Sequence, residues 1–117
     1  MTDAIVLYGD SLRHPNIPWR AKFFAPDPMV YIESGDRRIL MVGGLELGRA
    51  RKQAAVCEVR QFDGAEWRKR YQESGEFDAH AAGIAGVLNE LGADRVVVEA
   101  DFPIALARAL EQHDVVV

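Results

Sequence analysis

The fold of this chain is decided by residues 29–42, which read MVYIESGDRRILMV. Two strand-like runs, residues 29–34 and 38–42, stand on either side of Gly35-Asp36. A short connection that contains glycine between two such runs is typical of a β-hairpin, because glycine adopts the backbone angles of the turn without strain. This stretch therefore predicts two antiparallel strands that are neighbours in one sheet.

The residues before the hairpin predict a strand and then an irregular loop. Residues 4–8 form a compact apolar run that ends at Gly9-Asp10-Ser11, as a buried strand entering a turn would. Residues 12–28 contain four prolines and few periodic apolar positions, which favours an irregular loop.

The residues after the hairpin predict helices that alternate with strands. Residues 45–54 predict a helix whose apolar stripe is formed by Leu47, Ala50 and Ala54. Residues 56–59 predict a strand, and the polar stretch 61–75 is expected to be partly helical.

The clearest helix covers residues 77–91, where Ile84, Leu88 and Leu91 follow the spacing of one buried face. Asp78 is suited to cap its first turn, and Gly92 is suited to close its last turn in the left-handed conformation. Both ends of this helix are therefore marked in the sequence.

The last third of the chain predicts a strand, a helix and a final strand. Residues 95–98 are rich in β-branched side chains, as in a buried central strand, and residues 115–117 resume as a strand. Asp101 and Pro103 suit the start of the helix between them. The expected inner side of that helix consists of Ile104, Ala107 and Leu110.

Together these elements predict the α/β class, with a mixed β-sheet flanked by helices and crossover connections. A chain of 117 residues is long enough to bury a single core, so residues 1–117 are expected to form one domain. The three valines that end the chain lie inside an expected strand, which predicts a cut at a domain boundary.

Composition and charge restrict the function. The net charge is -4, divided into +2 over residues 1–60 (nine basic, seven acidic) and -6 over residues 61–117 (five basic, eleven acidic). This balance argues against nucleic-acid binding, which depends on clustered Lys and Arg.

The longest apolar runs are far below the roughly 20 residues that span a bilayer, and the N-terminus lacks a basic signal region. The single Cys57 fits a reducing compartment, so we expect a cytoplasmic protein.

The sequence contains no recognisable catalytic or metal-binding motif. Its three histidines, His14, His80 and His113, are far apart, and none has a second ligand at a metal-binding spacing. His80 is expected to be exposed, opposite the apolar stripe of its helix, and His113 suits a helix C-terminus. Cys57 has no neighbouring base or cation and is expected to fill the core.

Glycines and carboxylates also have structural explanations. The segment 43–48 lacks the spaced glycines of a phosphate-binding turn. Asp10, Glu46, Asp94 and Asp101 fall at the ends of expected elements, where caps and turns account for them. We therefore assign no catalytic, cofactor-binding or metal-binding residue.

Five phrases of the sequence nevertheless stand out in their order along the chain: Pro26-Asp27-Pro28-Met29-Val30-Tyr31-Ile32-Glu33, Gly35-Asp36-Arg37-Arg38, Leu45-Glu46, Arg49-Ala50 and Asp101-Phe102-Pro103-Ile104-Ala105-Leu106-Ala107. Together they resemble the N-terminal domain of creatinase/prolidase-type metallopeptidases, the family of Xaa-Pro aminopeptidases and Xaa-Pro dipeptidases. The resemblance implies a ribonuclease H-like topology and a downstream pita-bread catalytic domain, absent from this chain, that holds two divalent metal ions, Mn or Zn. The family's ligands, two Asp, one His and two Glu, lie in that absent domain.

Two functions follow as hypotheses. The first is a non-catalytic N-terminal domain of an Xaa-Pro peptidase, inactive alone, which shapes access of the peptide substrate and contributes to homo-oligomer contacts. Trp19, Phe23 and Phe24 are its candidate interface, because aromatic side chains anchor protein contacts. The alternative is a free-standing module that binds a protein or a small ligand through residues 12–28. A metal-dependent nuclease is a third, weaker possibility, which would require clustered acids.

Overall fold

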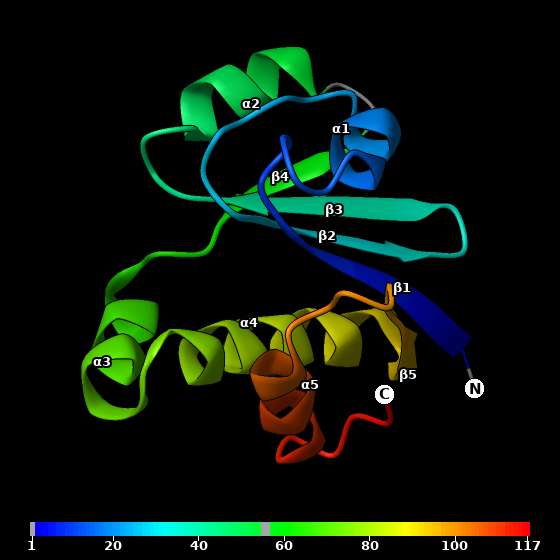
Figure 1. Cartoon of the computed structure of the whole chain (residues 1–117), viewed down its shortest axis with the longest axis vertical. Coiled ribbons are helices and arrows are strands. Elements are labelled where there is room, and N and C mark those ends of the chain that lie inside the picture. Colours follow the sequence, from blue (N-terminus) through cyan, green and yellow to red (C-terminus); the bar gives the residue numbers. More distant parts are fainter. Residues whose placement is uncertain (1, 55–56) are drawn as a thin grey trace.

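The computed structural model describes residues 2–54 and 57–117 and contains one five-stranded sheet in the order β4-β3-β2-β1-β5 (Figure 1). The strands are β1 (Thr2–Gly9), β2 (Met29–Ser34), β3 (Arg37–Val42), β4 (Glu58–Gln61) and β5 (Ala93–Val97). Strand β2 is antiparallel to β1 and β3, whereas β1 and β5 are parallel, as are β3 and β4. Four strands therefore run in one direction, and their carboxyl ends meet at one edge of the sheet.

Four of the five helices over the described residues cover the two faces of this sheet (Figure 1). Helices α1 (Asn16–Ala21) and α2 (Leu47–Gln53) lie on one face, and α4 (Glu76–Leu91) and α5 (Ile104–Glu111) lie on the other. Helix α3 (Ala65–Ser74) packs against α4. The predicted α/β class, a mixed sheet flanked by helices, is confirmed. None of the helices over the described residues has the length and apolar character that a membrane span needs.

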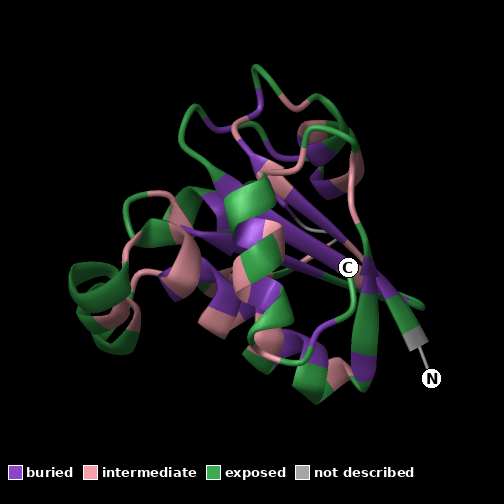
Figure 2. Cartoon of the chain, turned by 60° about the horizontal axis from the view of Figure 1, so that its bottom comes forward, coloured by how far each residue is buried: buried purple, intermediate pink, exposed green. Residues whose placement is uncertain are grey.

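The core consists of two layers because the central strands are apolar on both faces (Figure 2). Ile32 of β2 and Ile39 of β3 pack with Ile84 of α4, while Tyr31 and Leu40 pack on the face that carries α1 and α2. A sheet buried on both sides requires continuous apolar runs rather than alternation, and residues 29–32 and 39–42 provide them.

The hairpin and the end of α4 follow the sequence predictions. Ile32 pairs with Ile39 and Ser34 with Arg37, so the two strands join at Gly35, whose φ is +60°. Gly92 closes α4 with a φ of +72°, and its amide donates to the carbonyl of Asn89. Both glycines take the left-handed conformation that L side chains rarely adopt.

The predicted irregular loop over residues 12–28 is wrong in part, because it contains helix α1. Pro15 precedes the helix and Pro18 lies in its first turn, where a missing amide proton breaks no intrahelical bond. Ile17 and Ala21, four residues apart, are buried against the sheet. The prolines that suggested a loop are therefore compatible with a short helix.

The starts of two helices also differ from the prediction. Helix α4 begins after Gly75, and Asp78 forms no capping hydrogen bond but lies 3.9 Å from Arg70. Helix α5 begins after Pro103, so Asp101 lies before its first turn and does not cap it. Its inner side is formed by Leu106 and Leu110, and Ile104 is 67% exposed. Ile104 lies two residues before Leu106, about 200° around the helix, and therefore points away from the core.

Strand β5 is an edge strand of the sheet, not the predicted central strand. Residues 115–117 form no strand, but Val116 bridges to Arg95 and donates to the carbonyl of Asp94. This bridge covers part of the free edge of β5. The expected strand 56–59 is found two residues later as β4, and Val56 lies outside the described residues.

Candidate functional site

The carboxyl ends of β3 and β4 border a pocket of about 260 Å³. Its walls come from the turn after β3, the loop before β2 and the segment after β4, and His80 and Glu76 of α4 complete it. Ligands of open α/β sheets bind outside the carboxyl ends of the strands, since the loops that follow these strands diverge there. This edge is therefore the candidate functional site.

His80 is buried at this site, with 3% of its surface exposed, and the prediction of an exposed histidine is wrong. Its ring is surrounded by Tyr8, Phe62 and Trp67, at centroid distances of 5.3, 4.8 and 5.4 Å. Phe62 and Trp67 come from the segment 61–75, which was expected to be partly helical and contains α3. Burial lowers the pKa of His80, and Glu76, whose carboxylate lies 3.7 Å from Nε2, partly opposes this effect.

Tyr8 links the end of β1 to the start of α4. Its hydroxyl donates to Oε1 of Glu76 over 3.2 Å, and its ring packs edge-on against Phe77 at 5.9 Å. Burial, and secondly the negative charge of Glu76, raise the pKa of Tyr8, because both disfavour a phenolate. Tyr8 is therefore a hydrogen-bond donor here and not a general base.

Trp67 separates this pocket from a second cavity of about 660 Å³ between α3 and α4. Its indole Nε1 is buried and has no hydrogen-bond partner among the described residues. Buried indole nitrogens usually find an acceptor, because an unmade hydrogen bond is costly. The indole nitrogen of Trp67 is therefore an unsatisfied donor inside the wall between the two cavities.

The carboxylates of the pocket hold its shape. Asp63 accepts from the backbone amide of Gly44 over 3.0 Å and from the side chain of Gln61 over 2.8 Å. Glu46 is paired with Arg49. With Asp63 and Glu46 engaged and the pKa of His80 lowered by burial, the described residues that line this pocket show no pair of nucleophile and base.

The three residues of the predicted interface are not brought together on one surface. Trp19 and Phe24 are 67% and 52% exposed, but Phe23 is 2% exposed and belongs to the core, where the Arg49 guanidinium lies 4.5 Å from its ring centre. Phe23 is therefore excluded from a surface contact. The interface role of Trp19 and Phe24 stays a prediction.

Cys57 packs against the core layer below α1 and α2, as expected. Its Sγ lies 3.8 Å from the carbonyl oxygen of Ala21. Burial raises the pKa of its thiol, and the positive charge of Arg38 only partly offsets this effect. The thiol therefore lacks the thiolate character that a nucleophile needs.

The structure also brings together His14 and Asp101, which the sequence predicted to lie in unrelated segments, with Glu99, which no sequence motif indicated. His14 lies in the loop between β1 and α1, and Glu99 and Asp101 lie in the loop between β5 and α5. One ligand atom of each residue lies within 4.8 Å of the others. More than 80 positions separate His14 from the two carboxylates, so no local motif signals this group.

The sheet and its flanking helices form an α/β domain with the fold found in part of solved Xaa-Pro peptidases. The chain is similar to an Xaa-Pro dipeptidase from Bacillus anthracis, with 20% identity and a TM-score of 0.72 over 98% of this chain and 28% of that one. It is also similar to an X-Pro aminopeptidase from Thermotoga maritima MSB8, with 16% identity and a TM-score of 0.71 over 97% of this chain and 28% of that one.

A third solved structure, a proline dipeptidase from Streptococcus agalactiae 2603V, matches with 19% identity and a TM-score of 0.61. The match covers 95% of this chain and 75% of that one. No protein-family model and no curated protein matches the sequence. At these identities the similarity shows the fold, and the chain spans little more than a quarter of the first two peptidases.

Proposed function

We propose that this chain is the non-catalytic N-terminal domain of a cytoplasmic Xaa-Pro aminopeptidase or dipeptidase, where it shapes substrate access and oligomer contacts. The observation that carries this proposal is the coverage of the structural matches. The fold accounts for 98% of this chain but 28% of the Bacillus anthracis dipeptidase, so most of that chain lies outside the matched region. A catalytic domain downstream of Val117 is the corresponding expectation for this protein.

The described residues do not fit the two-metal centre that the resemblance implies. Such a centre takes two Asp, one His and two Glu, whereas the group of described residues close enough to hold an ion is His14, Glu99 and Asp101. Three ligands are too few for a pair of ions bridged by carboxylates. We therefore derive no hydrolytic step in this chain and propose that it is inactive alone.

Trp19 and Phe24 are the proposed contact residues toward the catalytic domain or a second subunit. Both rings are more than half exposed, and Trp19 has the cations of Lys22 and Arg20 at 5.4 and 5.8 Å from its ring centre. Large aromatic side chains contribute most of the binding energy at protein interfaces when they become buried. Exposed rings beside basic groups suit a partner surface that carries carboxylates.

The first experiment compares the 117-residue chain with the longer gene product. Both are incubated with Mn²⁺ or Zn²⁺ and an Xaa-Pro dipeptide, and the release of the N-terminal amino acid is measured. We expect release only by the longer protein. Turnover by the 117-residue chain alone would contradict the proposal.

The second experiment tests the contact residues in the longer protein. Trp19→Ala and Phe24→Ala are compared with Ile104→Ala, which removes a side chain as exposed as that of Trp19 from the opposite helical layer. We expect the first two variants to shift the oligomeric state in light scattering or to change KM, and the third to do neither. Equal behaviour of all three variants would remove Trp19 and Phe24 from the interface.

A free-standing binding module is the second candidate function. The 260 Å³ pocket beside Trp67 and the buried His80 favours it, because a small ligand fits that volume. The two proposals differ in the gene: an open reading frame that stops after Val117 supports the module, and one that continues for a further domain supports the peptidase.

A further inference from the structure

The loops after β1 and β5 meet because these two strands are parallel neighbours in the sheet. His14 lies in the first loop, five residues after the end of β1, and Glu99 and Asp101 lie in the second, two and four residues after the end of β5. Their side chains converge at the carboxyl edge of the sheet, on a pair of strands that does not line the 260 Å³ pocket.

The distances among the three groups suit a single metal ion. Nδ1 of His14 lies 3.5 Å from Oδ2 of Asp101, and one ligand atom from each of the three residues lies within 4.8 Å of the others. Two ligands bound tetrahedrally at about 2.0–2.2 Å are roughly 3.3–3.6 Å apart. The imidazole and one carboxylate therefore already have the required separation, and an oxygen of Glu99 lies within 4.8 Å of both ligand atoms.

Two neighbours fix the ligands before any ion binds. The imidazole of His14 lies directly on Gly9, where an added Cβ would stand 2.0 Å from its Cδ2. The backbone amide of His14 donates to the carbonyl of Asp10 over 3.0 Å, and the side chain is only 18% exposed. Asn16 donates to Oε2 of Glu99 over 2.9 Å, as the hydrogen-bond partners of metal-binding carboxylates do, and a carboxylate has a further oxygen for the ion.

The charge around the cluster attracts a cation. Two carboxylates face one imidazole, and the nearby Asp10 is held by the backbone amides of Leu12 and Arg13 over 3.0 and 2.9 Å. The guanidinium of Arg13 lies 3.8 Å from Asp10 and is 85% exposed, so it points away from the ligand atoms toward solvent. The three ligands together carry two negative charges, which match a divalent ion.

We propose that His14, Glu99 and Asp101 form a mononuclear site for a divalent first-row transition metal of the Zn²⁺ type. One imidazole and two carboxylates, without a thiolate, are suited to this class, and three protein ligands leave room for water. The ion joins the β1–α1 loop to the β5–α5 loop. The inference is independent of the proposed peptidase function, because it uses this chain's residues alone.

Titration of the chelator-treated 117-residue chain with Zn²⁺, followed by calorimetry and X-ray absorption, tests the site. We expect one ion per chain, bound by nitrogen and oxygen, and at least about a tenfold loss of affinity in both His14→Gln and Asp101→Asn. His113→Gln is the matched control, since it removes a partly exposed histidine outside the cluster, and we expect it to bind as the original chain does.

Circular dichroism verifies the fold of each variant. If His14→Gln unfolds, the Zn²⁺ affinity of Asp101→Asn alone tests the site. This variant is expected to fold, because Asp101 is exposed and belongs to neither core layer of the described chain. Absence of binding, a sulfur ligand from Cys57 in the absorption spectrum, or unchanged affinity in a folded Asp101→Asn chain would each overturn the proposal.

Discussion

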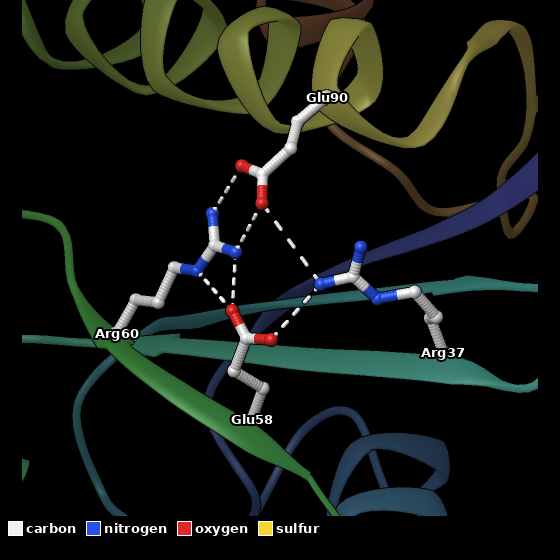
Figure 3. Close-up of polar contacts among 4 residues, drawn as sticks. All are labelled: Arg37, Glu58, Arg60 and Glu90. Atoms are coloured by element: carbon white, nitrogen blue, oxygen red, sulfur yellow. Dashed lines mark hydrogen bonds and ion pairs between the residues drawn. The ribbon is translucent and has the colours of Figure 1, made fainter.

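Arg60 of β4 and Glu90 of α4 form a bidentate salt bridge, in which both terminal nitrogens of the guanidinium lie 2.7 Å from the carboxylate oxygens (Figure 3). Glu58 of β4 bonds to the same guanidinium and also accepts from Arg37 of β3 over 2.9 Å. Two strands and a helix are therefore joined by one network at the edge of the sheet. Hydrogen bonds from Arg60 are the main cause of the lowered pKa of both Glu58 and Glu90.

Replacement of Glu90 by glutamine is expected to lower the melting temperature slightly at neutral pH. A carboxyl whose pKa is lower in the folded chain stabilises the fold above its ordinary value of 4.5, and this contribution disappears as the pH falls through the folded value. The difference between Glu90→Gln and the original chain should therefore vanish in acid and shrink in high salt. Thermal unfolding monitored by circular dichroism measures both effects.

The control for this prediction is Glu111→Gln, which changes an exposed carboxyl at the end of α5 that has no ion pair among the described residues. It should leave the melting temperature nearly unchanged. A pH-independent difference between Glu90→Gln and the original chain would assign the effect to packing rather than to charge.

His80 predicts a second effect of pH on stability, which comes from a buried base rather than from an exposed acid. Burial lowers its folded pKa below the ordinary value of 6.5, so the unfolded chain binds a proton first as the pH falls. The free energy of unfolding should therefore decrease as the pH is lowered through 6.5. The contribution of His80 to this decrease should end below its folded pKa. His80→Phe should remove this decrease, whereas His113→Gln should keep it. Urea unfolding at a series of pH values gives the slopes, and equal slopes for His80→Phe and the original chain would contradict the interpretation.

Helix α1 supplies a third prediction, because it carries a buried and an exposed large side chain two residues apart. Ile17→Ala should reduce the free energy of unfolding by about 2–4 kcal/mol, since Ile17 is fully buried in the layer under α1. Trp19→Ala should change it by no more than about 0.5 kcal/mol, since Trp19 is exposed. Urea denaturation of the two variants makes the comparison, and similar losses would mean that residues 16–21 do not form the helix described.

The parts of the fold that the sequence predicted are those with local signals. The hairpin at Gly35 and the helix that ends at Gly92 each combine an apolar pattern with a residue that takes a left-handed backbone. Helix α1 was missed because its signal is weak: two buried positions, Ile17 and Ala21, stand among prolines that also suit a loop. Short helices depend on tertiary packing, which a local pattern does not contain.

The candidate site was missed for a different reason. His80 lies four residues before Ile84 and therefore on the buried face of α4, so its expected exposure contradicts the helical spacing itself. Phe62 and Trp67, from another segment, complete its burial. Likewise, the sheet order and not the sequence spacing brings His14 to Glu99 and Asp101. Contacts of this kind become visible only when the order of the strands is known.

Replacing Gly86 within α4 and Gly92 at its C-cap by alanine should change the free energy of unfolding in opposite directions. Gly86 lies inside the helix with open space where an added methyl group would stand, so Gly86→Ala should stabilise the chain by about 0.5–1 kcal/mol through helix propensity. Gly92 has a φ of +72°, so Gly92→Ala should destabilise it by about 1 kcal/mol. Chemical denaturation distinguishes the two, and a loss of stability in Gly86→Ala would show that the cavity beside α4 does not tolerate a methyl group.

Gly9 combines a positive φ of +146° with the closest contact that an added methyl group would meet at any glycine of the described chain. Its Cβ would stand 2.0 Å from Cδ2 of His14, so Gly9→Ala should cost about 3 kcal/mol or more. Gly35→Ala, which also has a positive φ but open space, should cost only about 1 kcal/mol. The difference between them measures the contact with His14, and a double-mutant cycle isolates it: His14→Ala should recover part of the stability lost in Gly9→Ala. Additive losses in that cycle would show that the imidazole does not lie on Gly9.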